Sequence, residues 1–189
     1  MIQKSILLVL LLINYTSNSF SQSLDAKRDP KRDVNLSPSQ NSKINPLKNS
    51  QINPRFNWNI NPNHNEFINP ISFTKINPKY NQELNPQFNR LLNPMFSNAL
   101  HPKNPVWRGL YVFDKDDKLI SFITVASQQV LLCFDDKGEW TCYFIKSSTG
   151  IYNQFSKDGE WTGMYLCSDS SEGYNIFSKE GEWTGYHIK

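Results

Sequence analysis

Hydrophobic and polar positions follow three different patterns along this chain. A short apolar run occupies residues 6–13, and then from Leu36 an aliphatic residue recurs at every eighth position as far as Leu100. From residue 107 onward, short apolar and aromatic runs alternate with polar, glycine-containing segments. Because such periodicity is the main sequence signal of local structure, we divide the chain into residues 1–21, 22–106 and 107–189.

The first segment predicts a secretory signal peptide. Lys4 supplies a positive start, and Ser19-Phe20-Ser21 fits a small-x-small cleavage site. The apolar core Ile6–Ile13 has less than half the ~20 residues that a membrane-spanning helix needs, although a retained membrane anchor is the alternative. The next cysteine is Cys133, which argues against a lipid anchor. We expect a secreted or cell-surface protein with no stable membrane span after signal cleavage.

The second segment is an octapeptide repeat, (Ile/Leu)-Asn-Pro-x-x-Asn-x-x. Proline stands at every eighth position from Pro30 to Pro102. The clearest copies begin at Ile44, Ile52, Ile60, Ile68, Ile76, Leu84, Leu92 and Leu100. A period this strict indicates a repeat architecture.

Each octapeptide predicts one tight turn or a single helical turn. Proline fixes its own φ and holds the preceding asparagine in an extended conformation. The asparagine side chain can then accept a backbone N–H two or three residues later, and the next Asn-Pro prevents a longer helix. Two arrangements of the units remain open: an extended or flexible stalk of turns or disorder, and a narrow solenoid with the Ile/Leu residues in a thin core.

The third segment contains a second, longer repeat, with a period of about 21–22 residues, and predicts β-hairpins. In three copies a strand ends in Phe, a polar tip ends in Gly, and a second strand begins with Trp. The first copy is degenerate, with Asp117 in place of Gly and Leu119 in place of Trp. A three-residue tip with Gly at positive φ places three Phe-Trp pairs opposite each other. These pairs are Phe134/Trp140, Phe155/Trp161 and Phe177/Trp183.

A mainly β domain of about eight antiparallel strands follows from four such hairpins. Strands such as residues 141–145 are apolar on both faces, which favours a closed or two-layer form over a single sheet. The open alternatives are a barrel-like meander, a sandwich and a hairpin solenoid. The period and the Gly-x-Trp-x-Gly pattern resemble those of MORN-type and cell-wall-binding hairpin repeats in general style. The motif match is too loose to imply that this chain binds the same ligands.

Charge narrows the range of partners. Residues 24–106 carry a net charge of +6 and residues 107–189 a net charge of −4. The basic excess is spread thinly and has no Lys/Arg-rich cluster, so we expect no nucleic acid partner. Polysaccharide of the cell envelope, a surface protein and self-association are the partners that remain.

The three cysteines predict buried free thiols. With the three-residue tip, Cys133 and Cys142 face opposite sides of their hairpin and do not pair, whereas a two-residue Lys137-Gly138 tip would set them opposite each other. Their spacing fits no zinc pattern, and the histidines are isolated in the sequence. We expect no metal and no cofactor.

No catalytic constellation is evident, so we expect no enzyme. The acidic residues at the hairpin tips have the chemistry of tight turns, although a secreted hydrolase is a third possibility. They are Asp114, Asp116, Asp117, Asp135, Asp136, Asp158 and Glu180.

The candidate ligand-binding residues are aromatic and recur once per hairpin: Trp140, Trp161, Trp183, Tyr152 and Tyr174. They form either an aromatic ladder for sugar rings or the core of each hairpin. The sequence thus predicts an exported interaction protein in which an octapeptide spacer carries a β-hairpin binding head. The alternative is a structural protein that self-assembles through the octapeptides.

Overall fold

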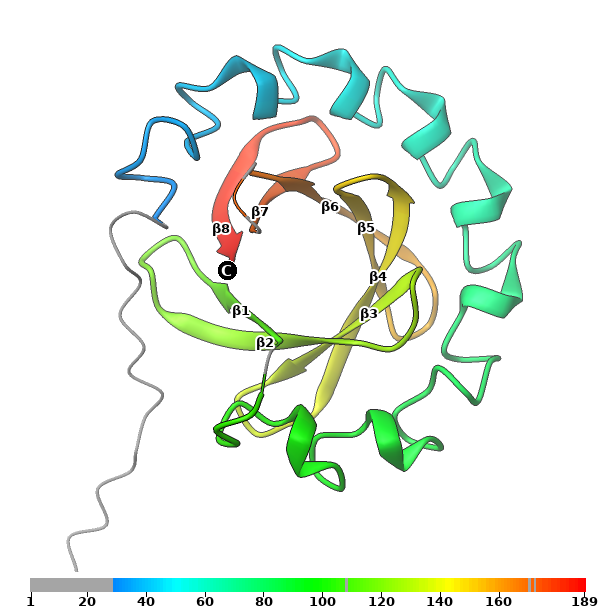
Figure 1. Ribbon diagram of the computed structural model, residues 1–189. Helices are drawn as coiled ribbons and strands as arrows, with labels where there is room; N and C mark the ends of the chain where they lie inside the picture. Colours follow the sequence, from blue (N-terminus) through cyan, green and yellow to red (C-terminus); the bar gives the residue numbers. More distant parts are fainter. Residues whose placement is uncertain (1–28, 108, 170, 172) are drawn as a thin grey trace, which may run out of the picture.

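The computed structural model describes residues 29–107, 109–169, 171 and 173–189. The predicted signal peptide lies outside these residues. The described chain consists of a β-barrel and a belt, residues 29–107, that curves round the outside of the barrel (Figure 1). No helix among the described residues is long and apolar enough to cross a membrane.

The C-terminal region is a closed antiparallel meander barrel with its strands in chain order. Of the three predicted alternatives, the barrel is therefore the correct one. Pairing of β1 with β8, Val112 with Ile188 and Phe113 with His187, closes it. The strands are β1 Leu110–Phe113, β2 Leu119–Val125, β3 Val130–Asp135, β4 Trp140–Ser148, β5 Ile151–Ser156, β6 Trp161–Ser168, β7 Tyr174–Ser178 and β8 Trp183–Ile188.

The hairpin tips have the predicted geometry. Phe134, Phe155 and Phe177 pair with Trp140, Trp161 and Trp183 respectively. The tip glycines adopt the left-handed conformation that the turn requires, with φ of 84° at Gly138, 94° at Gly159 and 91° at Gly181. In the first hairpin Asp117 takes this place, with φ of 60°.

The octapeptides form turns, as the sequence predicts, but each clear unit makes two turns rather than one. A tight turn follows the Asn-Pro pair, and a second turn follows the other asparagine; several of these second turns are 3₁₀ helices. The described 3₁₀ helices are η2 Ser42–Ile44, η3 Ser50–Ile52, η4 Trp58–Ile60, η5 Glu66–Ile68, η6 Thr74–Ile76, η7 Arg90–Leu92 and η8 Asn98–Leu100.

Asparagine side chains link each turn to the one before it. Asn53 Oδ1 accepts from Arg55 N at 3.0 Å, while Asn53 Nδ2 donates to Pro46 O at 3.1 Å. Asn57 Oδ1 likewise accepts from Asn59 N, and its Nδ2 donates to Gln51 O at 2.7 Å. Most of the other repeat asparagines make the same two bonds, which explains why asparagine prevails at both positions. Phe73 and Ser97 replace the second asparagine in two units, whose turns form without a side-chain cap.

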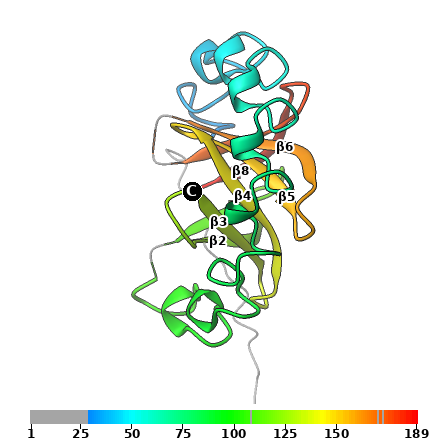
Figure 2. The same ribbon diagram turned by 90° about the vertical axis from the view of Figure 1, so that its right-hand side faces the viewer.

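The aliphatic residues of the octapeptides pack against the barrel. Ile68, Ile76 and Leu84 lie in one hydrophobic cluster with barrel residues such as Phe134, Tyr143 and Phe155. Ile60 lies in another with Tyr165 and Phe177. The belt is therefore neither a stalk nor a solenoid with its own core, because the barrel wall supplies the apolar partners. Figure 2 shows the belt as a narrow strip along the barrel's outer face.

Two hydrophobic layers result, one on each side of the barrel wall. The inner layer draws on all eight strands and on no belt residue; it includes Val112, Ile123, Phe144, Leu166 and Ile188. The outer layer is the aromatic row beneath the belt, in which Tyr143 stacks on Phe155 and Tyr165 on Phe177, with ring centroids 5.7 Å apart in both pairs. The two layers explain why the strands are apolar on both faces.

Three octapeptides of the belt lead from one hairpin tip of the barrel to the next. Asn53 and Asn77, three octapeptides apart, lie against consecutive tips: a Cβ on Gly181 would come within 2.5 Å of Asn53 Nδ2, and one on Gly159 within 2.8 Å of Asn77 Nδ2. Three octapeptides further along, His101 lies by Gly138. Towards the N-terminus Lys31 binds Asp117 of the first tip at 2.7 Å. The belt thus passes the tips in the order β1–β2, β7–β8, β5–β6, β3–β4.

The prediction that Cys133 and Cys142 face opposite sides is wrong. They are directly paired, although the predicted Phe134/Trp140 pair is also present. A bulge between Cys133 and Phe134 accommodates both pairs, because it places an extra residue on β4. All three cysteines are free thiols.

Candidate binding cleft at Trp161

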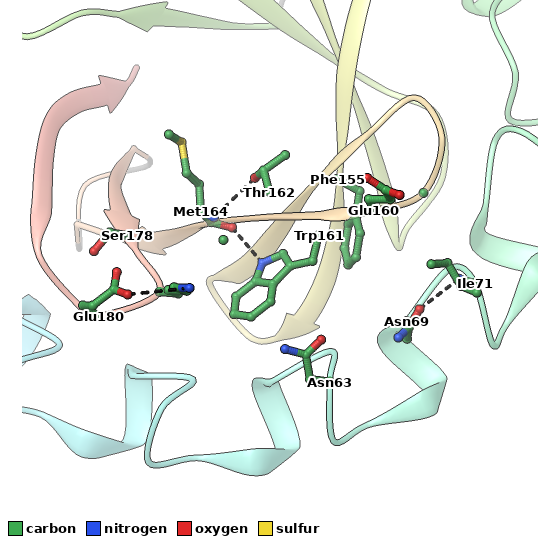
Figure 3. A pocket seen from close by; sticks show the side chains of 13 residues that line it. Asn63, Asn69, Ile71, Phe155, Glu160, Trp161, Thr162, Met164, Ser178 and Glu180 are labelled. Carbon is green, nitrogen blue, oxygen red and sulfur yellow. Dashed lines mark hydrogen bonds and ion pairs between the residues drawn. The ribbon is translucent and has the colours of Figure 1, made fainter.

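A cleft of about 500 Å³ opens between the β5–β6 hairpin, the β7–β8 tip and the belt. We call it the Trp161 cleft (Figure 3). It is lined by Asn63, Asn69, Ile71, Phe155, Gly159, Glu160, Trp161, Thr162, Gly163, Met164, Ser178, Lys179 and Glu180. A second hollow of about 310 Å³ adjoins it, because both share Asn63, Trp161, Lys179 and Glu180; Arg55 and Asn61 complete its wall.

Trp161 is held rigidly where the two hollows meet. Its Nε1 donates to Met164 O at 3.1 Å, and the ring packs against the outer aromatic cluster (Figure 3). The indole N–H is thus satisfied within the protein and the side chain is half-buried. What remains for a ligand is the apolar surface of the ring, which is suited to stacking.

The bulge after Trp161 shapes the cleft floor. Gly163 has φ of 80°, and Thr162 Oγ1 accepts from Met164 N at 3.3 Å. The Thr162 hydroxyl also donates toward Gln154 Oε1 at 2.9 Å. A Cβ at Gly163 would contact the Lys179 side chain at 3.6 Å, so the neighbouring tip closes directly over this bulge.

Polar side chains surround the indole from three segments of the chain. Asn63 comes from the belt, Glu160 from the β5–β6 tip and Lys179 from the β7–β8 tip, and all three are exposed. Lys179 Nζ lies 3.9 Å from Glu180 Oε1. An apolar ring edged by an amide, carboxylates and an ammonium group can bind a ligand that has both an apolar face and hydroxyl groups.

The five predicted binding residues do not form one site. Trp140, Trp161 and Trp183 lie at equivalent positions on the outer side of the barrel wall, each partly buried. Tyr152 and Tyr174 pack against the inner layer instead, with ring centroids 5.7 Å apart. Burial, with the neighbouring Tyr152 adding to it, raises the pKa of Tyr174 to about 12.

The tip carboxylates act mainly as turn formers. Asp114 Oδ1 accepts from the backbone N–H groups of Asp116 and Lys118, and Asp135 Oδ1 from those of Lys137 and Glu139. Within the described residues no three His, Cys, Asp or Glu side chains are grouped to hold a metal ion. Asp158 has a different role, because it binds Lys79 of the belt at 2.9 Å.

The sequence singled out Trp161 as a candidate but not its belt neighbours. Asn61, Asn63 and Asn69 belong to octapeptides far from Trp161 in the sequence, and the repeat itself gives no sign of which copies meet which tip. Glu160 was also missed; it precedes the tryptophan, as Glu139 and Glu182 do in the other hairpins. No family model, curated protein or solved structure matched this chain, so its function is argued from the cleft.

Proposed function

We propose that this is an exported, envelope-associated binding protein whose Trp161 cleft takes a saccharide unit of a polysaccharide. The observation that carries the proposal is the half-buried indole between two hollows, edged by Asn63, Glu160 and Lys179. Sugar rings present an apolar C–H face to an aromatic ring and hydroxyl groups to its polar neighbours. The belt acts as one wall of the site rather than as a spacer.

Binding is favoured over hydrolysis by the surroundings of the two cleft carboxylates. A carboxylic acid that donates a proton near neutral pH needs an apolar, buried environment. Glu160 and Glu180 are both exposed, and Glu180 lies beside Lys179. The cleft can therefore hold a sugar through hydrogen bonds, while neither carboxylate is placed as a general acid.

The test is a binding assay with the full chain on insoluble cell-envelope material and a panel of soluble polysaccharides. We expect Trp161→Ala to reduce binding by about two- to thirteenfold, since the aromatic stacking that it removes contributes about 0.5–1.5 kcal/mol. Trp58→Ala is the matched control, because Trp58 is 66% exposed and lines neither of the two hollows.

Circular dichroism and thermal melts of both variants must show that the fold is intact. Equal binding by wild type and a folded Trp161→Ala variant would refute the cleft as the site. Release of new reducing ends from a bound polysaccharide, lost in Glu160→Gln, would instead establish a hydrolase.

A second candidate function, self-assembly, is favoured by the apolar side chains that the belt exposes. Several large apolar residues of the belt are solvent-exposed, and exposed apolar surface can mark an interaction surface where it is contiguous. They are Val34, Leu47, Phe56, Trp58, Phe67, Ile71, Tyr80, Phe88, Leu91, Met95, Phe96 and Val106. Light scattering over a concentration series tests it: assembly that is lost in Phe56→Ser/Phe88→Ser and kept in Trp161→Ala would support this role.

A further inference from the structure

Cys133 and Cys142 meet on the inner side of the barrel wall. They are direct partners across the β3–β4 hairpin, and both pack against the inner hydrophobic layer. Cys133 is 5% exposed, while Cys142 is partly exposed. They are paired because a bulge interrupts the regular register between Cys133 and Phe134.

The two thiols are in contact. They share a hydrogen bond, and Cys133 Sγ also lies 3.5 Å from Ser121 Oγ. Gln154 Nε2 donates to Cys142 Sγ at 3.3 Å. The hydrogen bond with Cys142 lowers the pKa of Cys133, against the opposing effect of burial, and so favours the thiolate that disulfide exchange requires.

The backbone spacing suits a disulfide. Directly opposite residues of an antiparallel pair have Cα atoms about 4.5–5.5 Å apart, and a disulfide spans Cα separations of about 4.4–6.8 Å. Cys167 lies elsewhere: it is in the outer cluster with Ile60 and Tyr165, and its Sγ is 3.6 Å from Ile52 O of the belt. The barrel wall therefore separates Cys167 from the pair.

We propose that Cys133 and Cys142 are a dithiol that closes to a cross-strand disulfide when the protein meets a disulfide oxidant, while Cys167 stays reduced. With glutathione disulfide as the oxidant, the Cys133 thiolate attacks one glutathione sulfur, breaks the S–S bond and releases one glutathione. Cys142 then loses its proton and attacks the Cys133 sulfur of the mixed disulfide, which releases the second glutathione. Two protein thiols are oxidised and one glutathione disulfide is reduced to two thiols.

The experiment uses the full chain, prepared reduced and then incubated with or without glutathione disulfide. Thiols that remain are alkylated under denaturing conditions, and trypsin digestion without reductant is followed by mass spectrometry. Lys137 lies between the two cysteines, so the disulfide would join peptides 119–137 and 138–146, while Cys167 falls in peptide 158–179. We expect the joined peptides, two of three thiols protected, and alkylated Cys167.

Thermal melts provide the second readout. Oxidation should raise the Tm of wild type and of Cys167→Ala equally, because the cross-link restricts the unfolded chain. It should leave the Tm of Cys133→Ala and Cys142→Ala unchanged. Three alkylated thiols after oxidation of wild type, or a linkage that includes Cys167, would overturn the proposal, and this result does not depend on any variant folding. The proposal is also independent of ligand binding at Trp161.

Discussion

At the residue scale, the belt is held by a few buried amides of the barrel. Asn153 Nδ2 donates to Ile60 O at 2.8 Å, and Asn175 Nδ2 donates to Leu36 O at 3.0 Å. Both asparagines are fully buried, and they stand one hairpin repeat apart in the sequence. Leu36 and Ile60 are three octapeptides apart, so these bonds follow the same match between belt and barrel.

We expect Asn153→Ala to destabilise the protein by about 1–3 kcal/mol, because it leaves the buried Ile60 carbonyl without its donor. Urea unfolding of the full chain measures the change. Asn59→Ala, at an exposed belt position, is the control and should have little effect. A loss no larger than that of the control would show that the bond adds nothing to belt attachment.

At the element scale, the octapeptide is a link of fixed length. Gly159 and Gly181, at consecutive hairpin tips, each lie close to a belt asparagine, and these two asparagines are three octapeptides apart. The local turn, by contrast, depends only on asparagine bonds to neighbouring units. The number of octapeptides between two tips is therefore set by contacts with the barrel, whereas each turn is set by hydrogen bonds to neighbouring units of the belt.

Deletion of residues 85–92 separates these two determinants. Leu84 would then precede Asn93-Pro94, so the octapeptide pattern stays unbroken while the interval from Asn77 to His101 falls from three octapeptides to two. We expect a loss of at least one buried aliphatic contact, about 1.5–3 kcal/mol, in urea unfolding. The substitution Gln87→Ser/Phe88→Ser, at exposed positions of the same unit, is the control.

A deletion variant as stable as wild type would mean that the belt tolerates any number of units. That result would contradict the three-to-one match and favour a loosely attached belt. Hydrogen exchange at the β3–β4 and β5–β6 tips would locate the change, because these two tips flank the shortened interval.

At the scale of the whole molecule, belt and barrel share their hydrophobic packing. The aromatic row of the barrel wall, which includes Phe134, Tyr143 and Phe155, is buried by Ile68, Ile76 and Leu84. Within the described structure, separating the two would leave both of these apolar surfaces facing water. Opposite net charges on the two halves, +6 and −4, add an attraction that salt weakens.

We therefore expect residues 29–107 expressed alone to lack fixed structure, and residues 107–189 alone to expose their aromatic wall and aggregate. Co-expression should restore a soluble, compact complex, measured by size-exclusion chromatography and near-ultraviolet circular dichroism. A monomeric barrel fragment that melts like the full chain would show instead that the belt is dispensable for the fold.

The sequence by itself determined the turns of the octapeptides, the four hairpins and their Phe-Trp pairs. All of these depend on residues within about one repeat of each other, such as Phe155, Gly159 and Trp161. Strands with two apolar faces also indicated a closed form, although they did not distinguish a barrel from a sandwich.

Only the tertiary structure decided where the belt lies, how Cys133 meets Cys142 and which asparagines line the Trp161 cleft. The belt position depends on contacts between residues far apart in the chain, such as Leu36 and Asn175, 139 positions from each other. The octapeptides share the same aliphatic, Asn-Pro and Asn positions, so this pattern does not say which unit faces which tip. That choice is made by the specific contacts of Asn53, Asn77 and His101 with successive tips, which lie three units apart along the belt.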